Sequence, residues 1–446
     1  MPVQLELPFS TVTAFDVETR GNEDVSVVYA KAELPTTHTF PAGVRKHTTT
    51  SIELADTPVN GRPARLVLTL PRLRDPQSGA TATFKPTIAD PHHRITQRLS
   101  AEIRRRIALG DSFTRISEDI GVSPRVIGKI ADRFFRELEI LFDPKATAHI
   151  GIDECHLKGH KRAVIVDVQN DELIDILEYQ NRDDLYRKLV FLKERDRVEA
   201  VVSDFHGPYF QAARAVFSGA AMVVDKYHII LQVDRAMHEQ RKAVRRKRPK
   251  HRQSELEGDM RLMGQHYKDL SKEDALKLDG ILKNNPTLEV AYWIKEDFHK
   301  IFNSEDLREA EVAYGKWRAK AVEEAPGVFQ APITLIDNWH AYVFSYFDVT
   351  PPITNARTEQ MNNKLKNLYE DCRAFGTEGG KRWNFEKFRA LALLRFGQRS
   401  FDRYIERYQT FVAEHGFTPF GEPLPTDPVD DLYRQLGYDE VSLRSL

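Results

Sequence analysis

The spacing of apolar residues changes along the chain, and each change predicts a different kind of structure. Residues 50–85 alternate apolar and polar positions around the turn sequences NGRP and DPQSG, which predicts a small β-rich module. The weak pattern of residues 1–45 supports no prediction. From Arg94 onward the apolar residues recur every four positions, which is typical of a helix: Ile95, Leu99, Ile103 and Ile107.

Two further helices follow this first one. Gly110 ends the first helix, and Gly121 ends a short second one. Ser123 and Pro124 form a typical start for a third helix that runs to about residue 138. Three helices with a glycine turn before the last predict a helix-turn-helix domain.

The third helix has two different faces when its residues are placed at about 100° per position. Its apolar face contains Val126, Ile127, Ile130, Phe134 and Leu138. Its basic face contains Arg125, Lys129, Arg133 and Arg136. An apolar face that docks on the bundle and a free basic face suit insertion into the major groove of DNA. The alternative is a plain three-helix bundle with a charged surface.

After residue 142 the pattern predicts short strands and helices in turn. Three consecutive strands are followed by helix, strand, helix, strand and helix, in the order ATAHIGIDECHL, KRAVIVDVQ, DELIDILEYQ, RDDLYRKLVFLKERD, VEAVVSD, GPYFQAARAVFSG, AAMVVD and a helix from Lys226. A meander of three strands followed by alternating helices and strands predicts an α/β fold with a mixed sheet of ribonuclease H-like topology.

The remaining chain is mostly helical. Residues 235–345 contain no clear strand, so they predict an all-α insertion, and a further helix begins near Thr354. We therefore expect six segments, namely a β-rich module, a helix-turn-helix domain, the first part of the core, the insertion, the second part of the core and a tail: 1–88, 89–145, 146–234, 235–345, 346–400 and 401–446.

Composition narrows the class of protein. The chain has 446 residues, of which 41% are hydrophobic and 29% are charged, as in ordinary globular proteins. It contains no apolar run long enough for a membrane span and no signal-peptide pattern at its start. Two cysteines exclude a disulfide framework and a four-cysteine zinc site, so we expect a reducing, cytoplasmic setting.

The distribution of charge is more informative than the net charge of -1. Residues 241–252 include eight Lys or Arg and no acid, and we expect four of them to contact DNA phosphates: Arg245, Arg246, Lys247 and Arg248. The alternative interpretation of such a run is a solvated helix end.

Two aspartates are predicted to lie on neighbouring strands of the sheet. Asp153 lies in the first strand of the core and Asp204 ends the fourth, and these strands are neighbours in a ribonuclease H-like sheet. Carboxylates so close repel each other unless a cation neutralises them, and their hard oxygen atoms favour Mg²⁺ or Mn²⁺. Glu359 can supply a third acid, because it shares a polar helix face with Asn355, Asn362, Asn363 and Lys366.

These motifs resemble a known family. IGIDECHLKGH, VVSDFHGPYFQAA, VVDKYH and TNARTEQMNNKLKNL, in this order, are similar to motifs of the insertion-sequence DNA transposases of the ISL3 family. The resemblance runs from about residue 46 to about residue 399. It implies an Asp-Asp-Glu triad of Asp153, Asp204 and Glu359 on a ribonuclease H-like core, with two Mg²⁺ or Mn²⁺ ions.

The resemblance also bears on a second aspartate. Many such transposases carry an Asp or Cys after the second catalytic acid, followed three residues later by His, and Asp225 and His228 match this pattern. The resemblance thus makes Asp204 the metal ligand, and the supporting residues are Asp225, His228, Asn355 and Asn363. A helix cap on the helix from Lys226 is the alternative role for Asp225.

Two departures from the family pattern stand out. Residues 46–85 keep the outline of an N-terminal zinc module but contain no cysteine, so we expect no zinc. Gln360 follows the glutamate where the family often has glycine. We expect Cys155 and His156 to be a packed thiol and an edge histidine rather than a nucleophilic pair, and Asp167 to face solvent.

The resemblance implies a protein that acts on double-stranded DNA in a prokaryotic cytoplasm. It would bind terminal inverted repeats, cleave the ends of its element and join the 3′-OH ends to target DNA, as a homodimer or larger assembly. A metal-dependent nuclease of the same fold without strand transfer is one alternative. A domesticated DNA-binding protein with structural acids is another.

Overall fold

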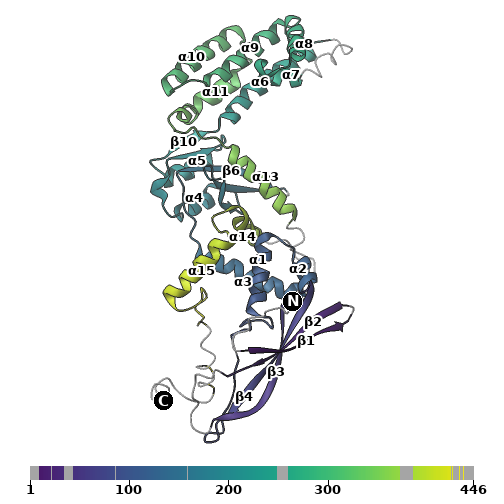
Figure 1. Ribbon diagram of the computed structural model, residues 1–446. Coiled ribbons are helices and arrows are strands. Elements are labelled where there is room, and N and C mark those ends of the chain that lie inside the picture. Colours follow the sequence, from purple (N-terminus) through teal and green to yellow (C-terminus); the bar gives the residue numbers. More distant parts are fainter. Residues whose placement is uncertain are drawn as a thin grey trace. The chain divides into compact units, whose positions relative to one another are not determined.

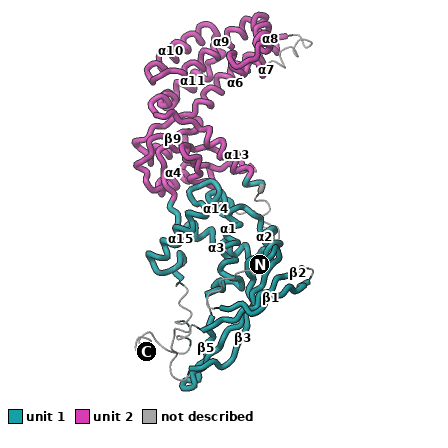
Figure 2. Tube along the Cα trace, in the orientation of Figure 1, with its two compact units in different colours: residues 1–143, 368–446 teal, residues 144–367 magenta. Residues whose placement is uncertain are grey.

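The computed structural model describes residues 10–21, 23–34, 44–85, 87–157, 159–248, 260–371 and 385–422, and residues 424, 431 and 435. The chain forms two compact units (Figure 2): unit 1 comprises 1–143 with 368–446, and unit 2 comprises 144–367. The predicted core segment 346–400 is therefore divided between the units. In the described part of the chain, no helix is both long and apolar enough to cross a membrane.

Unit 1 contains a mixed sheet of five strands in the described residues. The strands are β1 (Ser10–Arg20), β2 (Glu23–Ala32), β3 (Arg45–Val59), β4 (Arg62–Arg74) and β5 (Thr81–Thr83). Their order is β1-β2-β4-β3, with β5 paired to β4, and only the β2–β4 pair is parallel. The strands predicted in residues 50–85 are present, whereas β1 and β2 lie in the region for which no prediction was made.

The three helices predicted after Arg94 are confirmed. They are α1 (Gln97–Leu109), α2 (Phe113–Ile120) and α3 (Pro124–Leu141). Gly110 and Gly121 end the first two with positive φ angles of 88° and 63°, which glycine adopts without steric cost. Two later helices of unit 1, α14 (Phe385–Phe396) and α15 (Phe401–His415), pack against α3.

Unit 2 contains the second mixed sheet, of which Figure 1 labels β6 and β10. The predicted order of its strands and helices is confirmed. The elements are β6 (His149–Leu157), β7 (His160–Asp167), β8 (Glu172–Leu177), α4 (Arg182–Val190), β9 (Ala200–Ser203), α5 (Gly207–Val216) and β10 (Ala221–Val224). The sheet order is β10-β9-β6-β7-β8. Strands β10, β9 and β6 run parallel, while β7 is antiparallel to both of its neighbours.

The segment after β10 is helical in its described residues, as predicted for 235–345. It comprises α6 (Lys226–Arg246), α7 (Met260–Gly264), α8 (Lys272–Lys283), α9 (Pro286–Ile301), α10 (Leu307–Glu324), α11 (Gln330–Asn338) and α12 (His340–Phe344). Buried aromatic side chains such as Tyr292, Phe298 and Trp317 fill the space between these helices. The chain is thus a mixed α/β protein with two mixed sheets and many helices.

Helix α13 (Ala356–Asp371) approaches the second sheet at a glycine of β6. A Cβ atom built on Gly151 would lie 2.1 Å from Thr358 Oγ1, 2.7 Å from Val168 Cγ1 and 3.3 Å from Asn355 Oδ1. Only the absence of a side chain at Gly151 allows the helix to lie this close to the sheet.

We expect Gly151→Ala to destabilise unit 2 by about 1–3 kcal/mol, because the added methyl group overpacks the contact between β6 and α13. Urea unfolding measures this loss. Gly219→Ala is the matched control, because a Cβ there meets no atom within 4 Å and Gly219 has no positive φ angle. Equal unfolding midpoints for the two variants would contradict the close approach of α13.

Candidate active site

The register of three parallel strands brings three aspartates to one edge of the second sheet. Ser203, the last residue of β9, pairs with Ile152 of β6 on one side and with Val224 of β10 on the other. The next residue on each strand is an aspartate, namely Asp153, Asp204 or Asp225. The expected juxtaposition of Asp153 and Asp204 is therefore present, and Asp225 joins them.

Asp153 is largely buried, with 9% of its surface exposed. Its Oδ1 accepts a hydrogen bond from the Glu154 N–H at 2.7 Å, and its Oδ2 accepts one from Asn362 Nδ2 at 2.8 Å. Burial raises the pKa of Asp153 to about 7, and the nearby carboxylates of Asp204 and Glu359 add to the rise. Negative charge is therefore crowded at this edge of the sheet.

His228 lies between the other two aspartates. Its Nε2 is 2.9 Å from Asp204 Oδ2, and its Nδ1 is 3.1 Å from Asp225 Oδ2. Hydrogen bonds to Asp204 and Asp225 raise the pKa of His228 to about 10, so the imidazole is positively charged at neutral pH. Helix α6 begins at Lys226, directly after β10, and its first turn thereby supplies a cation to the acids.

Asp225 occupies the N-cap position of α6, but its side chain makes no capping hydrogen bond. It is 1% exposed, and its Oδ1 instead accepts the backbone N–H of Asn355 at 2.9 Å. Asp225 is therefore the N-cap of α6 by position, as the alternative interpretation expected, but its side chain bonds to other groups. Asp225 ties β10 to the start of α13 and orients His228.

Helix α13 supplies two amides and one acid to the site. Asn355 Nδ2 donates to Asp204 Oδ1 at 3.3 Å, and Asn362 contacts Asp153 as described above. Glu359 is exposed, and its negative charge contributes to the raised pKa of Asp153. Asn363 is also exposed, and no contact joins it to the acids in the described residues. The amide that reaches Asp153 is thus that of Asn362, which the sequence placed on the same polar face but not among the supporting residues.

The donor atoms at this edge suit a hard cation in type and in charge. The described residues nevertheless include no group of three His, Cys, Asp or Glu side chains arranged to hold a metal ion. The structure thus brings Asp153 and Asp204 together and places the charge of Glu359 near them, without forming a closed metal site.

For other polar residues of unit 2, the observed environment agrees with the prediction in some cases and differs in others. Cys155 is buried, as expected, and burial raises the pKa of its thiol to about 12. Asp167 is fully buried, so the prediction that it faces solvent is wrong: its carboxylate accepts the N–H groups of Gln169 and Asn170 in the turn after β7. Sequence reasoning also missed Tyr209, whose pKa is raised by burial and by the carboxylates of Glu154, Asp153 and Asp204.

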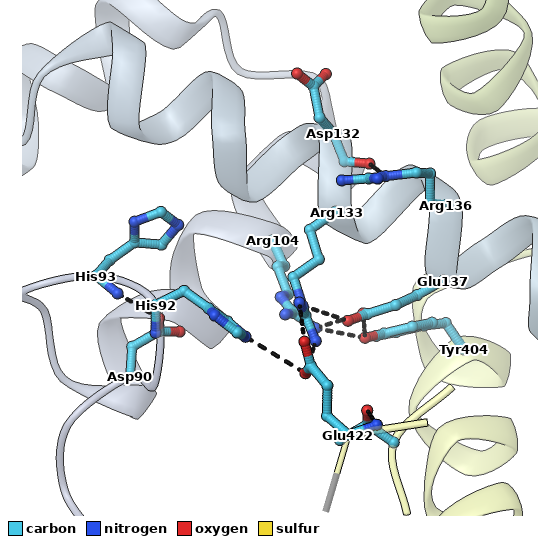
Figure 3. Close-up of polar contacts among 11 residues, drawn as sticks. Asp90, His92, His93, Arg104, Asp132, Arg133, Arg136, Glu137, Tyr404 and Glu422 are labelled. Carbon is cyan, nitrogen blue, oxygen red and sulfur yellow. Dashed lines mark hydrogen bonds and ion pairs between the residues drawn. The ribbon is translucent and has the colours of Figure 1, made fainter. Parts of the chain in front are cut away.

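In unit 1, the basic residues of α3 have different surroundings. Arg125 and Lys129, near the start of the helix, are exposed. Arg133 forms ion pairs with Glu422 and with Glu137, the latter at 3.3 Å from Nε to Oε1 (Figure 3). Its guanidinium also lies over the Phe420 ring, at 4.4 Å from the centroid. The basic face predicted for α3 is therefore free at its start and occupied at Arg133.

The contacts of Arg133 belong to a larger polar cluster. Buried Glu137 also accepts hydrogen bonds from Arg104 Nη1 at 2.8 Å and from the Tyr404 hydroxyl at 2.7 Å. Arg136 is exposed, with its guanidinium 5.6 Å from the Phe420 centroid. A cavity of about 890 Å³ beside α15 is lined in part by this cluster and by none of the predicted catalytic acids.

The basic run of the insertion is only partly described. Arg245 and Arg246 lie in the last turn of α6, and Lys247 follows as its C-cap. Arg248 donates to Asn285 Oδ1 at 2.6 Å, whereas Arg246 and Lys247 are exposed. Residues 249–252 lie outside the described part of the chain.

A comparison with known families identifies the family of this chain. A family model of ISL3 transposases, described as "Transposase", matches residues 150–390, which include all three predicted catalytic acids. No curated protein matches the chain. Membership of a transposase family implies an enzyme that processes DNA and has DNA as its partner. Because the match covers more than half of the sequence and contains the whole carboxylate edge, the chain belongs to the ISL3 family of transposases.

Proposed function

We propose that this transposase binds the terminal inverted repeats of an insertion sequence, cleaves its ends and joins the freed 3′-OH ends to target DNA. Asp153, Asp204 and Glu359 are the catalytic acids in this proposal. The observation that carries it is the parallel register of β6 and β9, which sets Asp153 beside Asp204, together with the charge of Glu359 near Asp153.

Two features of the fold support the finer assignments. The order β10-β9-β6-β7-β8, with helices after β8, β9 and β10, agrees with a ribonuclease H-like core. Helices α1, α2 and α3, with glycine turns between them, agree with a helix-turn-helix domain. The six segments given above remain the proposed domain division.

The carboxylates of Asp153, Asp204 and Glu359 would hold one or two Mg²⁺ or Mn²⁺ ions. The raised pKa of Asp153 supports this fit, because its crowded negative charge is what a divalent cation offsets. When bound, such ions activate an attacking oxygen and stabilise the charge that develops in phosphoryl transfer. His228 holds one oxygen of Asp204, and amide groups hold Asp153 and the other oxygen of Asp204, so the protein fixes the orientation of both carboxylates.

DNA contact is assigned to two basic surfaces. Arg125 and Lys129, at the exposed start of α3, would read the terminal repeats, because a recognition helix uses its N-terminal residues for base contacts. The run Arg245–Arg248 would contact phosphates. Two element ends must be held together for joining, which requires a homodimer or a larger assembly.

The triad is tested by three isosteric substitutions, Asp153→Asn, Asp204→Asn and Glu359→Gln. Each removes one metal-ligand charge and leaves α3 unchanged. We expect cleavage of terminal-repeat DNA to fall by at least about 10²-fold in each, with DNA binding nearly unchanged. Asp183→Asn, at an exposed aspartate of α4, is the matched control.

A gel assay that resolves cleaved and joined DNA reads out this experiment. Near wild-type cleavage in any one variant removes that residue from the triad. Cleaved ends without joined products in the wild-type protein would favour a metal-dependent nuclease instead of a transposase.

Replacing the buried Asp225 and replacing the partly exposed Asp204 are expected to change the stability of the protein by different amounts. Asp225→Ala leaves the buried N–H of Asn355 without its acceptor, which we expect to cost about 1–3 kcal/mol. Asp204→Ala should cost less, because its side chain is 31% exposed and its removal relieves repulsion on Asp153. Thermal unfolding measures both; a larger loss in Asp204→Ala would refute this assignment of roles.

The basic residues of α3 are expected to separate into two groups. Arg125→Ala with Lys129→Ala should narrow the difference in affinity between terminal-repeat and random DNA, because base contacts provide discrimination. Arg133→Ala should instead lower stability, since it leaves buried Glu137 with fewer partners. Arg246→Ala with Lys247→Ala should weaken binding to both DNAs and reduce the log-log salt slope by about 0.9 per lost phosphate contact.

Salt titrations of binding to both DNAs, with thermal unfolding of each variant, provide the measurements. A loss of discrimination from Arg133→Ala equal to that from the Arg125 and Lys129 pair would contradict the division of α3. An unchanged salt slope in the Arg246 and Lys247 variant would contradict phosphate contact by that run.

A further inference from the structure

Helix α13 and Asn355, the residue just before it, contact both strand carboxylates through amide groups. Asn362 is 5% exposed, and its Nδ2 donates to Asp153 Oδ2 at 2.8 Å. Asn355 is fully buried, and its Nδ2 donates to Asp204 Oδ1 at 3.3 Å. Glu359 lies between them in sequence, in α13. One helix, with the residue just before it, therefore carries the third acid and a hydrogen-bond donor for each of the other two.

We propose that Asn362 and Asn355 are positioning residues, which orient Asp153 and Asp204 from the helix of Glu359 so that docking of α13 aligns all three acids at once. This inference rests on the proposed function of these acids. It adds Asn362, which is not a member of the triad, to the residues that the reaction depends on.

The spacing of these residues suits this role. Asn355, Glu359 and Asn362 stand at positions i, i+4 and i+7, which lie on one face of a helix. Gly151 allows this face to approach β6 closely, because a Cβ atom built on Gly151 would lie only 2.1 Å from Thr358 Oγ1. Asn363 lies about 100° further around the helix and is exposed.

The chemistry of an amide also suits this role. An amide N–H fixes a carboxylate without adding a positive charge, so the acids keep the negative charge that attracts a cation. Asp153 has one donor on each oxygen, from Asn362 and from the Glu154 N–H, which sets the plane of the carboxylate. Each carboxylate oxygen has two lone pairs, so both oxygens keep the capacity to bind a metal ion.

Packing alone does not account for asparagine at these two positions. The Oδ1 atoms of Asn355 and Asn362 are buried and have no hydrogen-bond partner in the described structure. Unsatisfied buried acceptors lower stability, and an apolar side chain would avoid this loss. The N–H groups that contact the acids are therefore the feature that favours asparagine.

The test compares Asn362→Ala with Asn363→Ala in the full-length protein. We expect Asn362→Ala to weaken Mn²⁺ binding, measured by calorimetry, and to raise the Mn²⁺ concentration for half-maximal DNA cleavage, each by about 10–100-fold. The neighbouring Asn363→Ala should leave both quantities unchanged, because this side chain is exposed. Asn355→Ser, which keeps a short hydrogen-bond donor, should shift Mn²⁺ binding less than Asn355→Ala does.

Thermal unfolding in EDTA and binding to terminal-repeat DNA separate positioning from folding. Positioning predicts that Asn362→Ala keeps its DNA affinity and most of its unfolding temperature while its Mn²⁺ affinity falls. Unchanged Mn²⁺ affinity in Asn362→Ala, or a loss matched by Asn363→Ala, would overturn the inference. Either result leaves the proposed triad standing, whereas wild-type cleavage by Asp153→Asn removes Asp153 from the triad on which this inference rests.

Discussion

Electrostatic repulsion between carboxylates at one sheet edge is the constraint around which unit 2 is arranged. Three adjacent parallel strands are paired in register, so Asp153 within β6 and Asp204 and Asp225 just after β9 and β10 lie at one level of the sheet. Burial raises the pKa of Asp153, and the nearby carboxylates of Asp204 and Glu359 add to the rise. The structure offsets the repulsion with a charged imidazole from α6 and with neutral amides from α13. The first turn of α6 and the start of α13 therefore both lie beside these aspartates.

Asp225 and Asp204 differ in how far their side chains are exposed to solvent. Asp225 is enclosed, with 1% of its surface exposed, and its contacts are with His228 and the N–H of Asn355. Asp204 keeps part of its surface open to solvent, as a residue that contacts a metal ion or DNA must. The repeated pattern of a short strand that ends in aspartate thus serves two purposes. One aspartate can take part in chemistry, and the other holds the imidazole that stabilises it.

Hydrophobic periodicity predicted the strands and helices of unit 2. Their order, taken as ribonuclease H-like, placed the strands of Asp153 and Asp204 side by side. Periodicity did not distinguish Asn362 from Asn363, since both lie in one polar stripe and the choice depends on how α13 docks at Gly151. It assigned Asp167 to solvent because nothing local shows that an acid will satisfy the N–H groups of its own turn. Strand β1 was not predicted, and its apolar residues Val12, Phe15 and Val17 are exposed, so its sequence does not mark a buried face.

The basic face of α3 shows why a charge pattern does not by itself define a free surface. The angular positions of Arg125 and Arg133 place both on that face, yet Arg133 contacts Glu422 and Phe420, from the segment after α15, while Arg125 is exposed. Tertiary contacts of this kind come from residues far along the chain, so no local pattern contains them. They also have a consequence for binding. The second half of α3 is tied to other elements through Arg133 with Glu422 and through Glu137 with Arg104 and Tyr404, while its first turns present Arg125 and Lys129 to solvent. A recognition helix contacts bases with its N-terminal residues, so the occupied half supplies the rigidity that the proposed reading half requires.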